Sequence, residues 1–141
     1  MILPDVNVLI YAFRVESPFY PACSAWLAQT IAGEARFGIS PLTLSALVRI
    51  TTNRRTFDEA STLDQAFGFC QFLMDQPNCH LVEPGERHWG IFQRLCAETN
   101  ITGPRVTDAW FAALAIEHGC EWITFDRDFA RFSGLRSRAP A

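Results

Sequence analysis

Short apolar runs alternate with helix-like segments along the whole chain, and this alternation limits the possible folds more than any other feature. Four runs have the length and composition of buried strands, at 1–5, 36–39, 80–82 and 121–124. Each is followed by a segment whose apolar residues recur at helical spacing or by a short helical turn. Strands that alternate with helices form parallel sheets, because each helix returns the chain to the same end of the sheet. We therefore expect a three-layer α/β/α sandwich around a central, mostly parallel sheet.

Turn and capping residues set the expected ends of the helices. Pro41 follows a capping candidate, Ser40, and Gly119 follows an alanine-rich segment. The expected helices span 6–13, 18–31, 41–51, 61–75, 86–99 and 107–118. A last edge strand is expected at 135–136. The length of 141 residues predicts a single domain over 1–141, of which 137–141 form a loose tail.

The segment 61–75 combines a capping-box pattern with an unusually wide apolar stripe. Ser61 and Asp64 have the spacing of the capping box. Leu63 and Phe67 begin a stripe that Phe72 widens. We expect neighbouring helices of the same domain to bury this stripe, in preference to a subunit interface.

Charge and cysteine content exclude several classes of mechanism. The chain has no lysine, so all 12 basic residues are arginines and the net charge is −3. A P-loop lysine and a lysine Schiff base are therefore excluded, and arginine is left as the only phosphate-binding cation. The five cysteines form no Cys-x-x-Cys pair and are expected to be reduced. With no secretory or membrane-spanning segment recognisable, we expect a cytoplasmic protein without a membrane partner.

Three aspartates that lie far apart in the chain stand at the edges of apolar runs. Asp5 ends the first strand, Asp126 follows the strand at 121–124, and Asp108 begins the alanine-rich helix. In a parallel sheet these positions meet at one rim, where open α/β sheets bind ligands. A small group of carboxylates suits Mg²⁺ or Mn²⁺, which bind oxygen ligands and keep several waters. Each aspartate alone could equally be a helix cap or a favourable charge at a helix N-terminus.

Three sequence motifs together resemble the PIN-domain family, in the small bacterial form of the VapC ribonuclease toxins. The motifs are DVNVLIYA at 5–12, TDA at 107–109 with its alanine-rich helix, and ITFDRDF at 123–129. They occur in family order and span essentially the whole chain. The resemblance implies a Mg²⁺-dependent endoribonuclease, with Mn²⁺ as a substitute. It also implies an RNA substrate, a cognate antitoxin that holds the enzyme inactive, and a homodimer.

The resemblance also implies roles for individual residues. Asp5 and Asp108 match the principal metal ligands, and Asp126 matches the later acidic position that completes the site. Asn7 and Thr124 match polar residues that support the cluster. Asp128 begins the closing Asp-Phe pair, where we expect helix capping more than metal contact. Independently of the resemblance, we expect Arg49, Arg54 and Arg55, in and just beyond the helix at 41–51, to contact RNA phosphates. The competing interpretation is that they are ordinary solvated charges.

One departure from the family pattern leaves a second hypothesis open. The family places a glutamate in the helix after the second strand, and this chain has Ala46 there, with no acidic residue between Glu34 and Asp58. The site therefore has one carboxylate fewer, which should weaken a second metal position. A catalytically degenerate module that binds RNA or protein is the main alternative. A metal-dependent phosphatase is disfavoured, because Asp5-Val-Asn7 has an amide where its second acid should stand.

Overall fold

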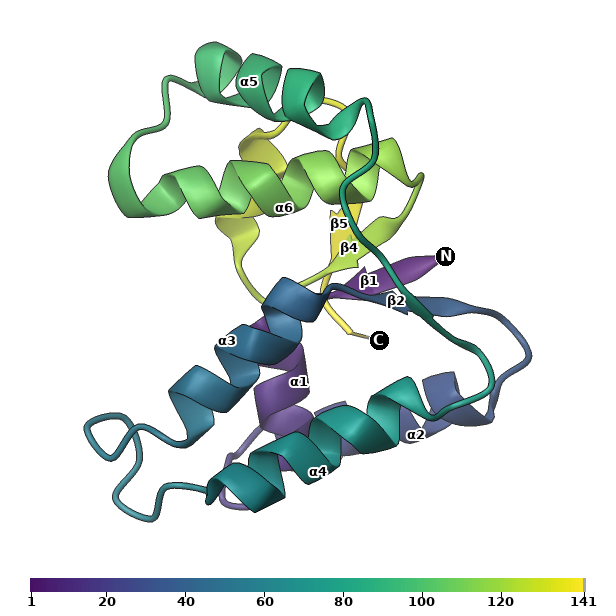
Figure 1. Ribbon diagram of the computed structural model, residues 1–141, viewed down its shortest axis with the longest axis vertical. Coiled ribbons are helices and arrows are strands. Elements are labelled where there is room, and N and C mark those ends of the chain that lie inside the picture. The colour runs from purple at the N-terminus through teal and green to yellow at the C-terminus, as the bar shows by residue number, and fades with distance from the viewer. Residues whose placement is uncertain (141) are drawn as a thin grey trace.

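The computed structural model describes residues 1–140 and confirms the expected three-layer fold. Five strands, all parallel, form one sheet in the order β3-β2-β1-β4-β5 (Figure 1). The strands are β1 (Ile2–Pro4), β2 (Phe37–Ile39), β3 (Cys79–Leu81), β4 (Glu121–Ile123) and β5 (Ser137–Arg138). The chain moves outward from β1 through β2 to β3 and then returns to the other side of β1. The strand order therefore reverses between β1 and β4, the position where such sheets bind ligands.

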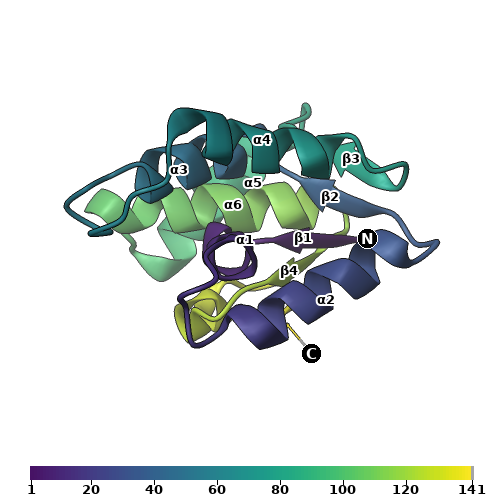
Figure 2. The ribbon, with the colours of Figure 1, turned by 90° about the horizontal axis from the view of Figure 1, so that it is seen from below.

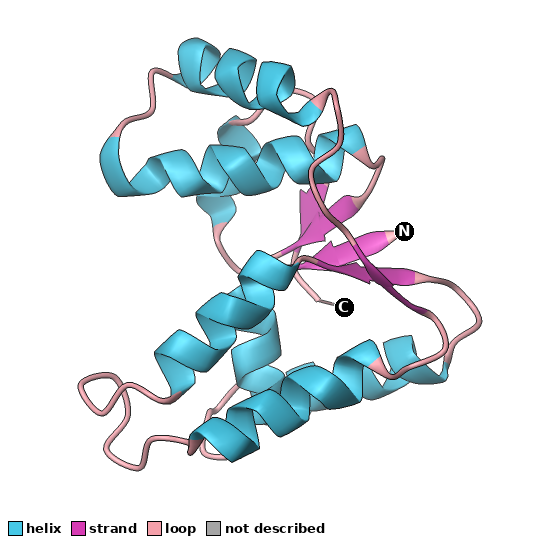
Figure 3. Ribbon diagram, in the orientation of Figure 1, coloured by secondary structure: helices cyan, strands magenta, loops and turns pink. Residues whose placement is uncertain are grey.

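Two layers of helices enclose the sheet, as Figure 3 shows. The helices are α1 (Val6–Phe13), α2 (Tyr20–Ala32), α3 (Pro41–Thr51), α4 (Leu63–Met74), α5 (His88–Thr99) and α6 (Val106–Glu117), with short 3₁₀ turns η1 (Gly103–Arg105) and η2 (Arg127–Arg131). Strand residues alternate between the two layers. Ile123 packs in the cluster formed with α1 to α4, whereas Leu3 and Trp122 pack in the cluster formed with α5 and α6. No helix within residues 1–140 is both long enough and apolar enough to cross a bilayer.

Several expected boundaries are confirmed, and others are wrong by one or two residues: α2 and α5 begin at Tyr20 and His88, two residues later than predicted. Helix α3 begins as predicted, with the Ser40 hydroxyl accepting from the Leu42 amide at 3.2 Å. The capping box of α4 uses Thr62 and Gln65, one residue later than predicted. The hydroxyl of Ser61 instead accepts from the Arg14 guanidinium at 2.8 Å.

The last strand lies two residues later than predicted, at Ser137–Arg138 instead of 135–136. Its position is set by β4, whose Trp122 and Thr124 amides donate to the carbonyls of Arg136 and Arg138 at 2.8 and 2.9 Å. The segment expected to be a loose tail therefore starts as a strand.

The predicted burial of the α4 stripe is only partly correct. Cys70 and Leu73 are buried, but the side chains of Leu63, Phe67 and Phe72 are 59%, 58% and 50% exposed. Helix α4 packs mainly on α3 and β3, and its Phe69 ring stacks on Phe13 of α1, so these contacts cover only part of its apolar surface. A wide stripe shows that a helix has apolar contacts on several sides, but it does not show that one chain supplies all of them.

Candidate functional site

The site lies at the carboxyl ends of β1 and β4, where the strand order reverses. Pro4 and Ile123 pair in these neighbouring strands, so the residues that follow them, Asp5 and Thr124, lie opposite each other. The Asp5 amide also donates to the Ile123 carbonyl at 2.8 Å and extends the pairing by one residue. Two segments separated by almost 120 residues are thereby fixed side by side.

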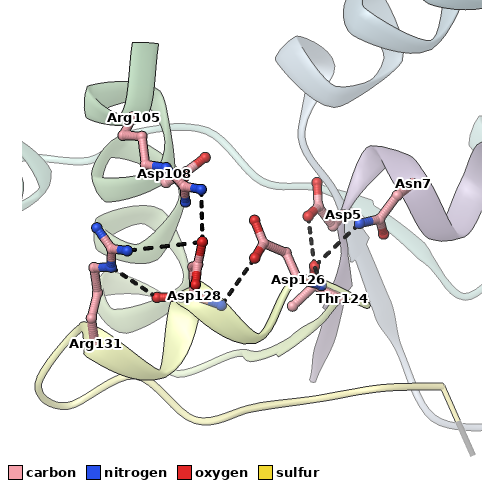
Figure 4. A network of polar contacts seen from close by, with 8 residues as sticks. All are labelled: Asp5, Asn7, Arg105, Asp108, Thr124, Asp126, Asp128 and Arg131. Atoms are coloured by element: carbon pink, nitrogen blue, oxygen red, sulfur yellow. Dashed lines mark hydrogen bonds and ion pairs between the residues drawn. The ribbon is translucent and has the colours of Figure 1, made fainter. Parts of the chain in front are cut away.

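Thr124 is the centre of a hydrogen-bond network that orients Asp5 (Figure 4). Its buried hydroxyl donates to Asp5 Oδ2 at 2.7 Å. Thr124 Oγ1 in turn accepts from the Asn7 side-chain amide at 3.4 Å and from the Asp126 backbone amide at 3.0 Å. The other carboxylate oxygen of Asp5 accepts from the Val6 amide at 2.7 Å, so Asp5 is also the N-cap of α1. Both oxygens of Asp5 are therefore held in place and keep lone pairs for a further partner.

Asp126 caps η2, whereas the sequence predicted that Asp128 would be the cap. The Asp126 carboxylate accepts from the Asp128 amide at 2.9 Å and caps η2. The Asp128 carboxylate, expected to be a cap, pairs instead with the Arg105 guanidinium at 2.7 Å and with Arg131 at 3.9 Å. A cap must precede the helical turn, and η2 begins at Arg127, so only Asp126 has the required position.

Asp108 lies in the first turn of α6 and is partly exposed. Its carboxylate is 3.4 Å from the guanidinium of Arg105, three residues earlier in the chain. Arg105 therefore bridges Asp108 and Asp128, and Figure 4 shows it on the same side of the site as Arg131. Sequence reasoning did not identify either arginine. The i, i+3 spacing of Arg105 and Asp108 was the one available signal.

The carboxylates act on one another electrostatically. Burial raises the pKa of Asp5 from 3.8 to about 6, against the lowering effect of its two hydrogen bonds, and the charges of Asp108 and Asp126 raise it further. Burial also raises the pKa of Asp108, and the charge of Asp126 adds to that effect, whereas Arg105 opposes it. The acidic residues of three distant segments thus share one electrostatic environment, in which a cation would relieve both burial and repulsion.

The three aspartates lie along one rim but do not converge on a common point. Within residues 1–140, no group of three acidic, histidine or cysteine side chains is arranged to hold one metal ion. The contacts explain why, since Asp126 is turned toward η2 and Asp108 toward Arg105. The donors still fit a hard divalent cation in their chemistry, because they are all oxygens and Asp5 is oriented with free lone pairs. Mg²⁺ needs only one or two such carboxylates, and water completes its shell.

Helix α3 contributes no acid to the site and ends in positive charge. Ala46 is partly buried in α3, and the three arginines expected to bind RNA follow it in the last turn and the next loop. All three are exposed and form no ion pair with residues 1–140. In Figures 1 and 2 the end of α3 and the start of α6 lie toward the same side of the molecule.

Comparison with known proteins gives consistent results over the whole chain. The model of the PIN domain matches residues 2–135. Ribonuclease VapC25 of Mycobacterium tuberculosis is 36% identical over 140 residues, which cover 99% of each protein. VapBC2 of Rickettsia felis, solved bound to a DNA fragment from its promoter, has a TM-score of 0.73 at 16% identity and covers 99% of this chain and 98% of its own. A toxin–antitoxin complex of Klebsiella pneumoniae has a TM-score of 0.65 at 19% identity, with coverage of 100% and 98%.

Proposed function

Because this chain belongs to the PIN-domain family, we propose that it is a VapC-type ribonuclease that cuts RNA at the rim formed by Asp5, Asp108 and Asp126. The observation on which this depends is the electrostatic coupling of the three carboxylates. They come from distant segments, and Asp108 and Asp126 both raise the pKa of Asp5. A structural cap would have no need of two further negative charges beside it.

We propose that a divalent cation, Mg²⁺ or Mn²⁺, is the cofactor, with Asp5, Asp108 and Asp126 as its ligands. When bound, it would supply an activated water and positive charge against the scissile phosphate. Asp5 is the anchor, because its carboxylate is oriented by Thr124 and by the Val6 amide before any ligand arrives. Asn7 supports this arrangement by donating to Thr124. Asp128 contributes through Arg105, whose charge opposes the rise in the pKa of Asp108.

The alternative proposal is a module that binds RNA or protein without cutting it. Ala46 favours this alternative, because it leaves the site one carboxylate short. The intact network around Asp5 favours an enzyme, since a site that no longer bound a cation would gain stability by losing its buried charge. We therefore prefer an active nuclease in which one metal position suffices.

The proposed partners are an RNA substrate, a cognate antitoxin and a second copy of the chain. Arg49, Arg54 and Arg55 are proposed to contact RNA phosphates, because they are exposed cations that form no ion pair with residues 1–140. The apolar surface of α4 is the proposed antitoxin site. A groove of about 530 Å³ lies between α3 and α4, and the half-exposed Leu63 and Phe67 form part of it. Contiguous exposed apolar surface of this kind marks protein interfaces.

Cleavage of a structured RNA tests the proposed activity. The wild type, Asp108→Asn and Asp58→Asn are compared with Mg²⁺, with Mn²⁺ and with EDTA. Asp58 lies in the exposed loop before α4 and is the control for loss of one negative charge. We expect metal-dependent cleavage by the wild type and the control, and none by Asp108→Asn, with all three folded by circular dichroism. Cleavage that survives both EDTA and Asp108→Asn would overturn the mechanism. A folded, metal-binding wild type that cuts no RNA would support the degenerate alternative.

The antitoxin site has its own test. The product of the neighbouring open reading frame is purified, and its affinity for the wild type, Phe67→Ser and Trp89→Ser is measured. Trp89 is 68% exposed on α5, in the opposite helical layer, and is the matched aromatic control. We expect Phe67→Ser alone to weaken binding, by about 30-fold or more, since hot-spot aromatics contribute about 2 kcal/mol or more. Equal affinity for all three proteins would place the antitoxin elsewhere.

A further inference from the structure

A second cavity adjoins the acidic network on the outer side of β4. It measures about 460 Å³ and lies at the carboxyl ends of β4 and β5. Thr124, Phe125, Asp126 and Arg127 line one side of it, and Arg138 and Ala139 line the other. Two of these residues, Thr124 and Asp126, belong to the network around Asp5. The cavity is therefore next to the proposed reaction site and has the size of a small-molecule subsite.

Phe125 is the aromatic residue in the lining of this cavity. Its side chain is 37% exposed although it is held by two other rings. The Tyr11 ring meets it edge-on with centroids 5.5 Å apart, the Phe19 ring is also 5.5 Å away, and Tyr11 and Phe19 are 4.9 Å apart. Tyr11 lies one turn of α1 after Asn7, so this three-ring cluster is anchored to the same helix that supports Asp5. A ring fixed in this way binds a flat partner with little loss of side-chain entropy.

Arg127 supplies an unpaired positive charge at the same cavity. Its side chain is exposed and forms no ion pair with residues 1–140. Arg138, the other arginine of the cavity, is already engaged, because it donates to Glu121 at 2.9 Å and to the Ala139 carbonyl at 3.3 Å. The cavity therefore has one cation available for a ligand, and this cation follows directly after Asp126 in the chain.

From these contacts we propose that the cavity is a nucleotide subsite, in which Phe125 stacks on an unpaired base and Arg127 binds the adjacent phosphate. The inference rests on the proposed ribonuclease function and adds that the substrate is single-stranded next to the cut. Stacking requires a free base face, and a base inside a duplex has both faces covered. An aromatic ring and a guanidinium group side by side match the two parts of one nucleotide.

Binding of a short single-stranded oligoribonucleotide with one 2-aminopurine base tests the subsite. Affinity is measured over a series of KCl concentrations in the Asp108→Asn background, which prevents cleavage. Phe125→Leu keeps an apolar side chain against Tyr11 but removes the stacking face. Arg127→Gln removes the charge. The matched controls are Trp89→Leu on α5, and Arg36→Gln, an exposed arginine just before β2 at the opposite end of the strands.

The two variants should weaken binding in different ways. Loss of stacking costs about 1–3 kcal/mol, so Phe125→Leu should lower the affinity by about 5- to 150-fold with the salt dependence unchanged, and quenching of the 2-aminopurine should be lost. Arg127→Gln should reduce the slope of log affinity against log salt by about 0.7, the value for one phosphate contact on a single strand. A purely structural role for either residue would not separate these two effects.

Four outcomes would overturn the subsite. The first is that both variants match their controls in affinity and salt slope. The second is that an RNA duplex of the same sequence binds as tightly as the single strand. The third is that both variants lose antitoxin binding but keep RNA binding, which would assign the cavity to the protein partner. Metal-dependent cleavage with an unchanged KM in both variants overturns only the subsite, whereas a wild type that cuts no RNA overturns the proposed function itself.

Discussion

Replacing Asp5 by asparagine should change the stability of the protein in a pH-dependent way. The pKa of Asp5 is raised from 3.8 to about 6, mainly by burial. At 1.36 kcal/mol for each tenfold change in proton affinity, this shift corresponds to about 3 kcal/mol. Between pH 3.8 and about pH 6 the folded state binds more protons than the unfolded state, so the free energy of unfolding falls as the pH rises. Above about pH 7 the whole destabilisation is present, and below pH 3.8 it is absent.

The asparagine variant removes the buried charge and therefore that pH dependence. Any loss of hydrogen bonding in the variant is independent of pH over this range, so it cancels when two pH values are compared. We expect the difference in unfolding free energy, variant minus wild type, to increase by up to about 3 kcal/mol between pH 4 and pH 7.5. Urea unfolding at both pH values in EDTA measures this difference, with Asp58→Asn as the control for loss of one negative charge.

Addition of Mg²⁺ completes this test. At pH 7.5 a metal concentration ten times the Kd should stabilise the wild type by about 1.4 kcal/mol, because the ion binds only the folded state, and it should stabilise Asp5→Asn much less. A difference between variant and wild type that is the same at pH 4 and pH 7.5 would refute the reasoning, since it would show that Asp5 bears no buried charge.

Three further predictions concern residues in the site and in the sheet. Ala46→Glu should restore a fourth carboxylate and tighten Mn²⁺ binding by about tenfold in calorimetry, because ligand charge tunes such sites; an unchanged Kd would place the missing acid elsewhere. Arg105→Gln should raise the pKa of Asp108 further, since Arg105 lowers it, so the acid limb of the pH–cleavage profile should move to higher pH. An unmoved profile would show that Arg105 does not act on Asp108. Gly38→Ala should destabilise the fold by about 1–3 kcal/mol in urea, because the new methyl would lie 2.6 Å from a valine methyl in the strand layer, whereas Gly68→Ala, with open space around it, should not.

The fold could be predicted because its signals are local and repeated. Each of the first four strands coincides with an apolar run, and most helices have a stop signal such as Gly119 or a cap such as Ser40. Parallel pairing then follows from the alternation itself. The final strand was misplaced because its two residues have no strand pattern of their own, and the register of β4 decides where pairing occurs.

The location of the site could be predicted, but the directions of its side chains could not. Asp5 and Asp126 follow neighbouring strands, so the sequence placed them at one rim. Which of Asp126 and Asp128 caps η2 depends on the backbone angles of that turn, and a spacing of two residues does not reveal them. The pairing of Arg105 with Asp128 joins segments more than 20 residues apart, and no local pattern indicates it.

The sequence also failed to predict that apolar side chains of α4 are exposed, for a different reason. An amphipathic pattern shows which faces of a helix are apolar, but the number of neighbours depends on how the layers pack. Phe67 and Phe72 belong to a stripe wide enough for contacts on several sides, and within residues 1–140 only part of it is covered. The prediction of burial within one chain assumed that every apolar contact is intramolecular.

A crystal of the protein grown with saturating Mn²⁺, with diffraction measured at a wavelength where manganese scatters anomalously, tests the central claim most directly. The account predicts an anomalous peak within bonding distance of an Asp5 carboxylate oxygen, with Asp108 or Asp126 rotated to join it. A crystal with no peak at Asp5, in which both side chains keep their contacts with Arg105 and η2, would contradict it.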